Sequence, residues 1–310
     1  MQIAAEIRQR AANLETIFVI IYFFVDEEYK KLSHLVARPG PKPEFSDSEV
    51  ITLSLLGEMF IDSADAWYGY VAKNHAHLFP KLISASRVHR RTKDLQLLVE
   101  MIRQKWAIAL EVCNETDFVM DSMPLPVCKR ARAGRNDRWA MEYNIDLADL
   151  FGHCASKNED IFGFKLHLLV TKQGIPAHYV LAPASEHDVV VAPNLLESYR
   201  SNIEVAADKG YVGLLKRLQN PAQHRIIIQA RQNQKQQNTK EEKDFLFKYR
   251  KTVEITNSML TEQFHIQRTR ALSKFGIQAR IIFKITALTL AMLINFSYDC
   301  PILSVKSLIF

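Results

Sequence analysis

Residues 117–124 read DFVMDSMP, a short apolar run that ends at Asp121 and is followed by a turn-forming sequence. Short runs rich in β-branched and aromatic residues and bounded by turn residues are typical of buried strands. Glycine or proline turns and helical segments separate the later runs along the chain. This pattern predicts an α/β domain in which a mixed sheet is packed with helices. The further runs are residues 164–171, 177–181, 203–206 and 225–229.

The chain before residue 117 has a helical pattern instead. A proline-rich stretch at 39–43 separates two helical blocks, because proline lacks an amide donor and restricts the residue before it. Ser46 and Glu49 fit a capping box, so a helix is expected to begin near Ser46. A later helix is expected to bury the apolar residues of 95–110 and to carry a basic cluster, residues 87–93, at its amino-terminal end. The cluster either contacts DNA phosphates or is an ordinary solvated helix end.

The carboxyl-terminal part, residues 249–298, is expected to form helices broken near Phe275 and Gly276. Its apolar stretch 281–298 approaches the length of a membrane span, but it contains polar residues such as Lys284 that are costly in hydrocarbon. We therefore expect a buried closing helix and no membrane. The polar segment 231–243 is expected to be a solvated loop.

Composition places weaker limits on function. A chain of 310 residues with 48% hydrophobic content can bury a large core, and its length suggests two domains. Lysine and arginine total 40 against 34 acidic residues, and the resulting charge of +6 fits a polyanionic partner without requiring one. The four cysteines lack metal-ligand spacing, and the apolar run 17–25 lacks a signal-peptide cleavage site. Reduced thiols and a cytoplasmic location are expected.

Asp121 and Asp208 each directly follow an apolar run, where a strand is expected to emerge into a loop. A carboxylate at such a point is held rigidly and yet is open to solvent. Two of them on neighbouring strands are suited to a hard cation such as Mg²⁺, which prefers oxygen ligands. The alternative is that each aspartate caps the turn or helix that follows, which is the commoner role. Residue spacing alone therefore does not identify an enzyme.

Three blocks follow one another in a particular order: DFVMDSMP (117–124), GFKLHLLV (163–170) and ADKGYV (207–212). The segments LAPASEHD (181–188) and YRKTVE (249–254) accompany them. Together the blocks resemble the DDE transposases of bacterial insertion sequences. The resemblance implies a ribonuclease-H-like fold in which two aspartates and a glutamate bind two Mg²⁺ or Mn²⁺ ions. The matching residues here are Asp121, Asp208 and Glu254.

The third acid stands in a modified motif. The family pattern has two residues between its tyrosine and arginine and a lysine seven positions after the glutamate, whereas here Tyr249 adjoins Arg250 and Thr261 takes the lysine position. We prefer Glu254 because Arg250, four residues earlier on a helix, would orient its carboxylate. The rival glutamates are Glu241, Glu242 and Glu262.

Residues expected to contact DNA are basic. They follow the first aspartate, flank the other two acids, belong to the 87–93 cluster, or lie farther along the helical region of Glu254, where Arg268 and Arg270 could substitute for the missing lysine. Each basic run is either a track for phosphates or an ordinary solvated surface. Trp139 and Tyr143 either stack on an unpaired base or pack in the protein, and His167 and His187 have packing or turn roles as alternatives to catalysis. The expected DNA contacts are Arg90, Arg91, Lys129, Arg130, Arg132, Lys209, Arg250, Arg268 and Arg270.

We expect a helical DNA-binding region at 1–112, a ribonuclease-H-like catalytic domain at 113–298 and a tail at 299–310. The resemblance implies a transposase that cleaves at element ends and joins the 3′-hydroxyl to target DNA by two-metal-ion phosphoryl transfer. Its partners would be double-stranded DNA, comprising terminal inverted repeats and target, and a second copy of the chain at the bacterial nucleoid. The alternatives are a catalytically silent DNA-binding remnant and a metal-dependent nuclease that does not join strands.

Overall fold

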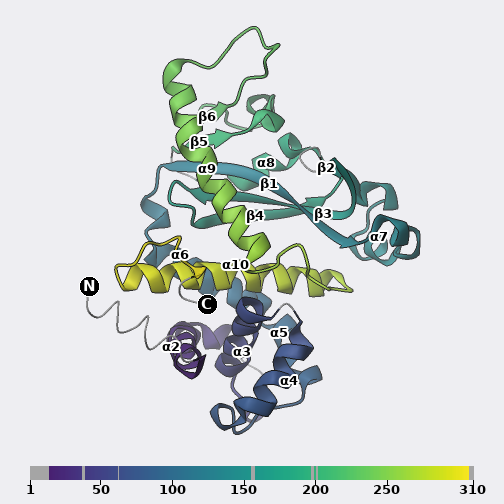
Figure 1. The fold of residues 1–310 in the computed structure, drawn as a ribbon, viewed down its shortest axis with the longest axis vertical. Helices are drawn as coiled ribbons and strands as arrows, with labels where there is room; N and C mark the ends of the chain where they lie inside the picture. Colours follow the sequence, from purple (N-terminus) through teal and green to yellow (C-terminus); the bar gives the residue numbers. More distant parts are fainter. Residues whose placement is uncertain are drawn as a thin grey trace. The chain divides into compact units, whose positions relative to one another are not determined.

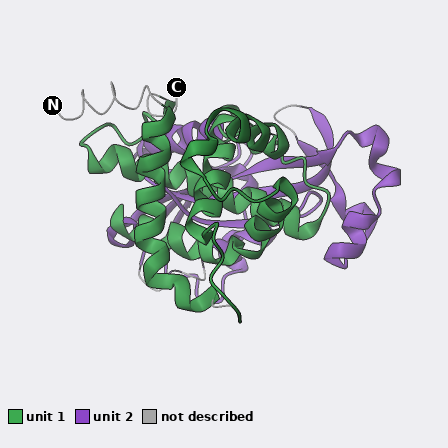
Figure 2. Cartoon of the chain, turned by 90° about the horizontal axis from the view of Figure 1, so that it is seen from below, with its two compact units in different colours: residues 1–110, 260–310 green, residues 111–259 purple. Residues whose placement is uncertain are grey.

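Two separately packed units make up the chain in this computed structural model (Figure 2). One comprises Met1–Leu110 with Leu260–Phe310, and the other comprises Glu111–Met259. The structure describes residues 14–36, 39–61, 63–154, 158–196, 199 and 202–306. Packing thus divides the chain near the predicted boundary at 112, but it groups the residues after 259 with the first hundred. The described part of the tail predicted at 299–310, residues 299–306, belongs to the same helical unit.

Helices form the first unit. The capping box that the sequence predicts is present, because Glu49 N donates to Ser46 Oγ at 3.1 Å and Ser46 N donates to Glu49 Oε2 at 2.6 Å. The single basic helix expected before residue 110 is instead two helices that meet at Leu95. The helices are α2 (Leu14–Leu32), α3 (Asp47–Phe60), α4 (Ala64–Asn74), α5 (Ala85–Asp94), α6 (Gln96–Ala109) and α10 (Lys274–Ser297).

Helix α10 is the core of this unit, where it packs against α3 and α6. It is long and apolar enough to cross a membrane by composition, yet most of its residues are buried in the unit, as predicted. Its buried Lys284 donates to Phe264 O at 2.6 Å, which satisfies a polar group that the interior would otherwise penalise. The carboxyl-terminal helices are broken as predicted, but the break is the segment 263–273, ahead of Phe275 and Gly276. Those two residues lie in the first turn of α10, which Ser273 caps by accepting from Gly276 N.

A six-stranded mixed sheet forms the second unit (Figure 1). All five predicted strands are present, and β2 is an addition that the sequence pattern did not indicate. The order is β2-β3-β1-β5-β6, and β4 also pairs with β3. The strands are β1 (Asp117–Cys128), β2 (Phe151–Cys154), β3 (Glu159–Thr171), β4 (Pro176–Pro183), β5 (Glu204–Ala207) and β6 (Arg225–Ile228).

Three helices accompany the sheet: α7 (Arg138–Tyr143), α8 (Asp188–Leu196) and α9 (Lys240–Glu262). Helix α9 crosses the face of β1 that carries Asp117 and Asp121, and Tyr249 Oη donates to Asp117 Oδ2 at 2.9 Å. Helix α8 packs on β3 and β4. Its first residue binds Lys165, which pairs with Pro124 and therefore points to the opposite face from Asp121. The two helices thus cover opposite faces of the sheet.

The segment between β6 and α9 is a loop, as the sequence predicts, although α9 already begins at Lys240. Asn238 closes it, because its side chain donates to Ile228 O at 3.0 Å and accepts from Ala230 N at 2.8 Å. This loop therefore fixes the start of α9 against the end of β6.

Candidate active site

Sheet register brings Asp121 and Asp208 to neighbouring positions. Strands β1 and β5 are parallel, and their last paired residues are Met120 and Ala207. The next residue on each is an aspartate. Because neighbouring parallel strands keep their side chains in step, the two carboxylates emerge close together at the carboxyl end of β5.

Asp121 lies within β1, not at the end of a strand as predicted. Strand β1 continues to Cys128, paired with β3 alone, because β5 has already ended. The sequence predicted an early end because Pro124 closes the turn-forming stretch after Asp121, and Pro126 also lies within the strand. They are tolerated here because one edge of this half of β1 has no partner strand. Asp121 is consequently held by the sheet at the point where that edge opens.

The surroundings of Asp121 disfavour its charge. Burial raises the pKa of Asp121 to about 7; the Ser122 backbone amide opposes this shift, and the charges of Asp208, Asp188 and Glu254 add to it. Asn257 on α9 donates its amide to Asp121 Oδ2 at 2.9 Å. Asp121 is thus a partly buried carboxylate among other acids, and its side-chain hydrogen-bond donor is a neutral amide. A bound cation would stabilise its charged form.

Asp208 does cap a turn. It begins the short 3-10 helix Lys209–Tyr211, and its Oδ1 accepts from Gly210 N at 2.7 Å. The capping role that the sequence left open is therefore present. A carboxylate has about four acceptor positions, so one hydrogen bond leaves Asp208 able to serve as a ligand as well.

Glu254 lies on α9, where Arg250 Nε donates to its Oε1 at 3.0 Å, the i,i+4 pair that the sequence predicts. With 56% of its side chain exposed, it is the most accessible of the three acids. All three line one pocket of about 420 Å³ between the part of β1 that ends its pairing with β5, the carboxyl end of β5 and helix α9. The structure therefore brings the three predicted residues to one place.

None of the rival glutamates lines this pocket. Glu241 pairs with Arg225, and Glu242 accepts from Thr239 N at 3.0 Å at the start of α9. Glu262 is the last residue of α9 and is exposed. Among the glutamates that the sequence offered, Glu254 is the one placed beside the two aspartates.

The family model described as a transposase DDE domain matches residues 113–290, more than half of the chain. This chain belongs to the DDE transposases. The mixed sheet with its helices, after a helical amino-terminal region, is the ribonuclease-H-like arrangement that the sequence predicts. The match extends into α10, so the family domain includes a helix that packs in the helical unit. No curated protein and no solved structure matches the chain.

The donor set of the transposase fits a hard divalent cation. Asp121 and Asp208 supply carboxylate oxygens, and Mg²⁺ usually takes one or two protein carboxylates and keeps several waters. The side chain of Asn257, whose amide nitrogen donates to Asp121, also has a buried amide oxygen without a hydrogen-bond partner. This oxygen is a further neutral donor atom beside Asp121. In the described ranges no three His, Cys, Asp or Glu side chains are already arranged as a metal-binding group, so the fit rests on the two aspartates and on the pocket that they share with Glu254.

The residues expected to contact DNA differ in how exposed they are. Arg91 is a correction: its guanidinium donates to Asp47 Oδ1 at 2.6 Å and to Phe45 O at 2.6 Å, with 12% of the side chain exposed. It holds α5 to the start of α3 and does not face DNA. Its neighbour Arg90 is exposed on α5. Adjacent residues of a helix point in different directions, but which of the two faces the protein is known only once the partner helix is placed. The sequence alone therefore could not separate Arg90 from Arg91.

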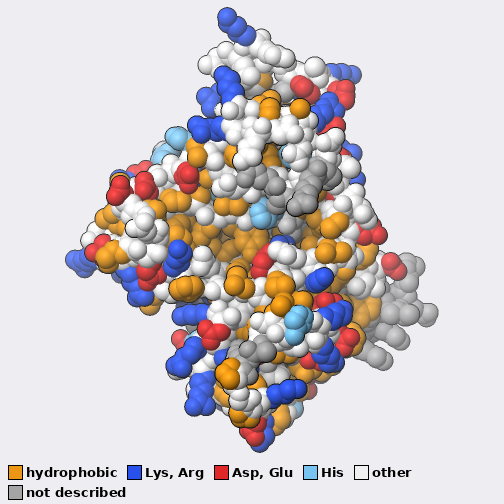
Figure 3. All heavy atoms as spheres, turned by 180° about the vertical axis from the view of Figure 1, so that it is seen from behind, with side chains coloured by type: hydrophobic (Ala, Val, Ile, Leu, Met, Phe, Trp, Pro, Cys, Tyr) orange, Lys and Arg blue, Asp and Glu red, His pale blue; other side chains and the backbone are white. Residues whose placement is uncertain are grey.

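The other basic candidates are exposed. Lys209 and Arg250 lie beside the acids, Arg130 pairs with Asp160, and Lys129 and Arg132 flank it after β1. Arg268 and Arg270 belong to the segment after α9, in the helical unit, and do not continue the helix that carries Glu254. Lysine and arginine side chains surround the upper end of Figure 3, formed by the loop before α9 and the start of that helix.

The sequence analysis missed two residues at the site, Asn257 and Asp188. Asn257 contacts Asp121, and the charge of Asp188 acts on both Asp121 and Tyr211. Burial first, and then Asp188, Asp121 and Asp208, raise the pKa of Tyr211 well above its usual value. Asp188 ends the LAPASEHD block, which was the available signal.

Trp139 and His167 pack inside the protein, whereas His187 is exposed just before α8. Trp139 is buried with its ring edge against Phe164, 5.9 Å between centroids, and Tyr143 also lies on Phe164 at 4.6 Å. Base stacking by Trp139 is therefore excluded in this arrangement. His167 is fully buried in β3, and burial lowers its pKa to about 4, so it is a neutral packed residue. The packing alternatives hold for both.

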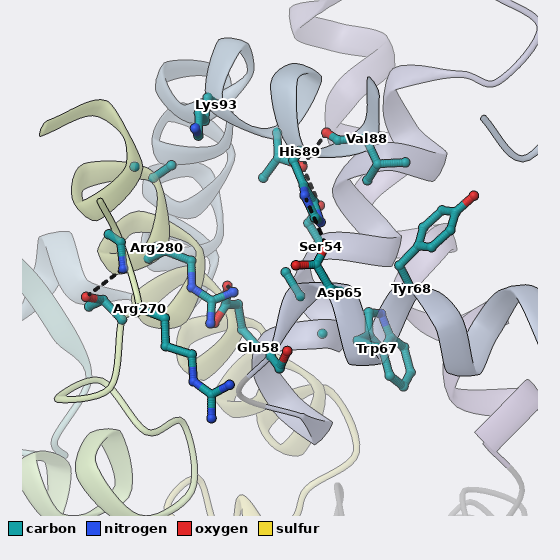
Figure 4. A pocket seen from close by; sticks show the side chains of 18 of the residues that line it. Ser54, Glu58, Asp65, Trp67, Tyr68, Val88, His89, Lys93, Arg270 and Arg280 are labelled. Carbon is teal, nitrogen blue, oxygen red and sulfur yellow. Dashed lines mark hydrogen bonds and ion pairs between the residues drawn. The ribbon is translucent and has the colours of Figure 1, made fainter. Parts of the chain in front are cut away.

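A second hollow, of about 320 Å³, lies within the helical unit between α3, α4, α5 and α10 (Figure 4). Its acidic side chains face basic ones: Arg280 Nη1 lies 2.6 Å from Glu58 Oε1, and His89 Nδ1 lies 3.6 Å from Asp65 Oδ1. Because its carboxylates have basic partners, this hollow is less suited to a metal ion than the pocket in the sheet unit.

Proposed function

We propose that this transposase cleaves DNA at the ends of its element and joins the freed 3′-hydroxyl to target DNA, with Asp121, Asp208 and Glu254 as the metal-binding acids. The observation that carries the proposal is that these three residues line one pocket at the carboxyl end of β5. The family match supports transposase function in general, and the site suggests how the reaction is performed.

Two Mg²⁺ or Mn²⁺ ions, when bound, would supply charge stabilisation and an activated oxygen nucleophile for in-line attack on phosphorus. Asp121 and Asp208 would hold them from rigid strand positions. Glu254 would approach from α9, where Arg250 restrains its carboxylate at 3.0 Å. Asn257 would keep Asp121 oriented through its 2.9 Å hydrogen bond.

The chemistry consists of two displacements at phosphorus. In the first, a water oxygen bonds to phosphorus while the bond to the 3′ oxygen breaks, which leaves a 3′-hydroxyl at the element end. In the second, that 3′ oxygen bonds to a phosphorus of target DNA while a target 3′ oxygen leaves. One P–O bond forms and one breaks in each step, so no external energy source is needed.

Double-stranded DNA is the proposed partner, both as terminal inverted repeats and as target. Lys209 and Arg250 flank the acids and would hold the phosphates beside the scissile bond, while Lys129, Arg130 and Arg132 would extend the contact. We propose a homodimer on paired element ends in the bacterial cytoplasm. Sedimentation of the protein with element-end DNA would show two chains per pair of ends, and monomers alone would contradict the dimer.

The test is a strand-transfer assay with element-end DNA, a plasmid target and Mg²⁺ or Mn²⁺. Asp121→Asn, Asp208→Asn and Glu254→Gln should abolish joined products, whereas Glu242→Gln and Asp244→Asn on the same α9 should not. DNA cut but never joined by the natural protein would identify a nuclease. DNA bound but uncut with either metal would identify a binding-only remnant.

A further inference from the structure

An ion pair lies behind the acids, on the face of the sheet that α8 covers. Lys165 Nζ on β3 is 3.1 Å from Asp188 Oδ1, at the first residue of α8, and it also donates to Glu186 O at 2.5 Å. About 19% of the Lys165 side chain and 24% of the Asp188 side chain are exposed. The pair ties the start of α8 to the middle of the sheet.

Asp188 meets the turn of Asp208 through Gly210. A Cβ atom placed on Gly210 would lie 2.9 Å from Asp208 Oδ1 and 3.4 Å from Asp188 Oδ2. Gly210 is also the residue whose amide donates to Asp208 Oδ1 at 2.7 Å. The same glycine is therefore bonded to the Asp208 carboxylate and in contact with that of Asp188, and a side chain there would displace the Asp208 carboxylate first.

The residue after this glycine anchors the turn. Tyr211 is fully buried, and α8 packs against the turn that contains it. A turn fixed on one side by a buried ring and on the other by Asp188 has little freedom to rotate, so the direction of the Asp208 carboxylate depends on where α8 begins.

Charge explains why Asp188 is paired. An uncompensated carboxylate this close to Asp208 and Asp121 would repel both, and like charges brought together in a partly buried site are costly. Lys165 supplies the compensating charge from the face opposite to the pocket. The pair can thus pack against the turn without adding net negative charge to it.

We propose that Asp188, held by Lys165, is a positioning residue that orients Asp208 for metal binding. The inference rests on the proposed function, in which Asp208 is a metal ligand. It predicts that metal affinity, and not folding or DNA binding, is what the ion pair determines. Replacing a residue that supports a metal ligand typically changes metal affinity or activity about 10-fold to 100-fold.

The test measures Mn²⁺ affinity by electron paramagnetic resonance, with element-end DNA present, for the natural protein and for Asp188→Asn. We expect affinity about 10-fold weaker in the variant, with cleavage recovered at high Mn²⁺. Glu115→Gln, which breaks the Glu115–Lys172 pair of 3.2 Å in the same unit, is the matched control and should keep the natural affinity. A purely structural role would lower the unfolding temperature and would not respond to added metal.

Two further variants keep the inference testable if Asp188→Asn folds poorly. Lys165→Arg preserves the ion pair and should retain Mn²⁺ affinity, while Lys165→Met, which removes the cation that holds Asp188, should weaken it as Asp188→Asn does. Natural affinity in Asp188→Asn would overturn the inference, and so would a loss as complete as in Asp208→Asn, which would make Asp188 a direct ligand. If the natural protein itself bound no Mn²⁺, the proposed function would fail first.

Discussion

Glu58 in the helical unit and Asp121 in the sheet unit are both acids removed from solvent, but their surroundings differ. Glu58 forms ion pairs with Arg280 Nη1 and with Lys284 Nζ, each at 2.6 Å. Asp121 receives the neutral amide of Asn257 and lies beside Asp208. A compensated charge of the first kind holds a fold together. An uncompensated one of the second kind costs stability and is suited to a cation that arrives with the substrate.

Replacing Asp121 should have the largest effect, and it should fall on activity alone. A bound metal stabilises the transition state by several kcal/mol, and about 1.4 kcal/mol corresponds to tenfold in rate, so Asp121→Asn should lower cleavage roughly a thousandfold. Stability should stay the same or rise, because the substitution removes a disfavoured charge. Single-turnover cleavage and thermal unfolding measure the two effects, and a clear fall in stability would argue against this account.

Replacing Glu58 should do the reverse. Glu58→Gln leaves Arg280 and the buried Lys284 without their charge partner, and breaking a buried pair typically costs about 3–5 kcal/mol. Denaturant unfolding should show a loss of this size in the helical unit. A change below about 1 kcal/mol, the range of exposed pairs, would remove the distinction between the two acids.

Asp121 should also make the stability of the metal-free protein depend on pH. Between the ordinary aspartate pKa near 3.8 and about 7, the folded protein keeps a proton on Asp121 that the unfolded chain has released. Raising the pH through this window therefore lowers the free energy of unfolding of the metal-free protein. The difference between the natural protein and Asp121→Asn should widen in favour of the variant as pH rises. Parallel curves would mean that Asp121 does not titrate in this range.

Arg91 and Arg90 also differ as a paired, enclosed residue and an exposed one, and the effects of replacing them should be smaller. Arg91→Ala should cost about 3 kcal/mol of stability, because it breaks the enclosed pair with Asp47. Arg90→Ala should leave stability unchanged and reduce the salt dependence of DNA binding by about one charge. Binding measured at several salt concentrations separates the two, and equal slopes in both variants would exclude Arg90 from the DNA contact.

Much of the sheet could be predicted because strands leave a local record. The apolar runs identify β1, β3, β4, β5 and β6, and turn residues separate them. Strand β1 was cut short because prolines normally end a strand, and the fact that makes them harmless, the early end of β5, is not local. Ser273 was a local signal for the start of α10 that the sequence analysis passed over.

The candidate site was predicted only in part, for a similar reason. Its three acids follow from resemblance, and the structure gathers them in one pocket. Asn257 and Asp188 carry no motif of their own that assigns a contact. Asn257 reaches Asp121 across 136 positions of sequence, which only the packing of α9 on the sheet decides. Side chains that support a site from distant elements are the part that spacing cannot supply.

The central claim is that a divalent cation binds at Asp121 and Asp208. Fe²⁺ can take the place of Mg²⁺ at oxygen sites, and with peroxide and ascorbate it cuts the polypeptide beside the place where it is bound. We expect cuts near residues 121 and 208 that excess Mg²⁺ suppresses and that are absent from Asp121→Asn. Cuts confined to other acidic segments, and unchanged in that variant, would mean that the cation binds elsewhere.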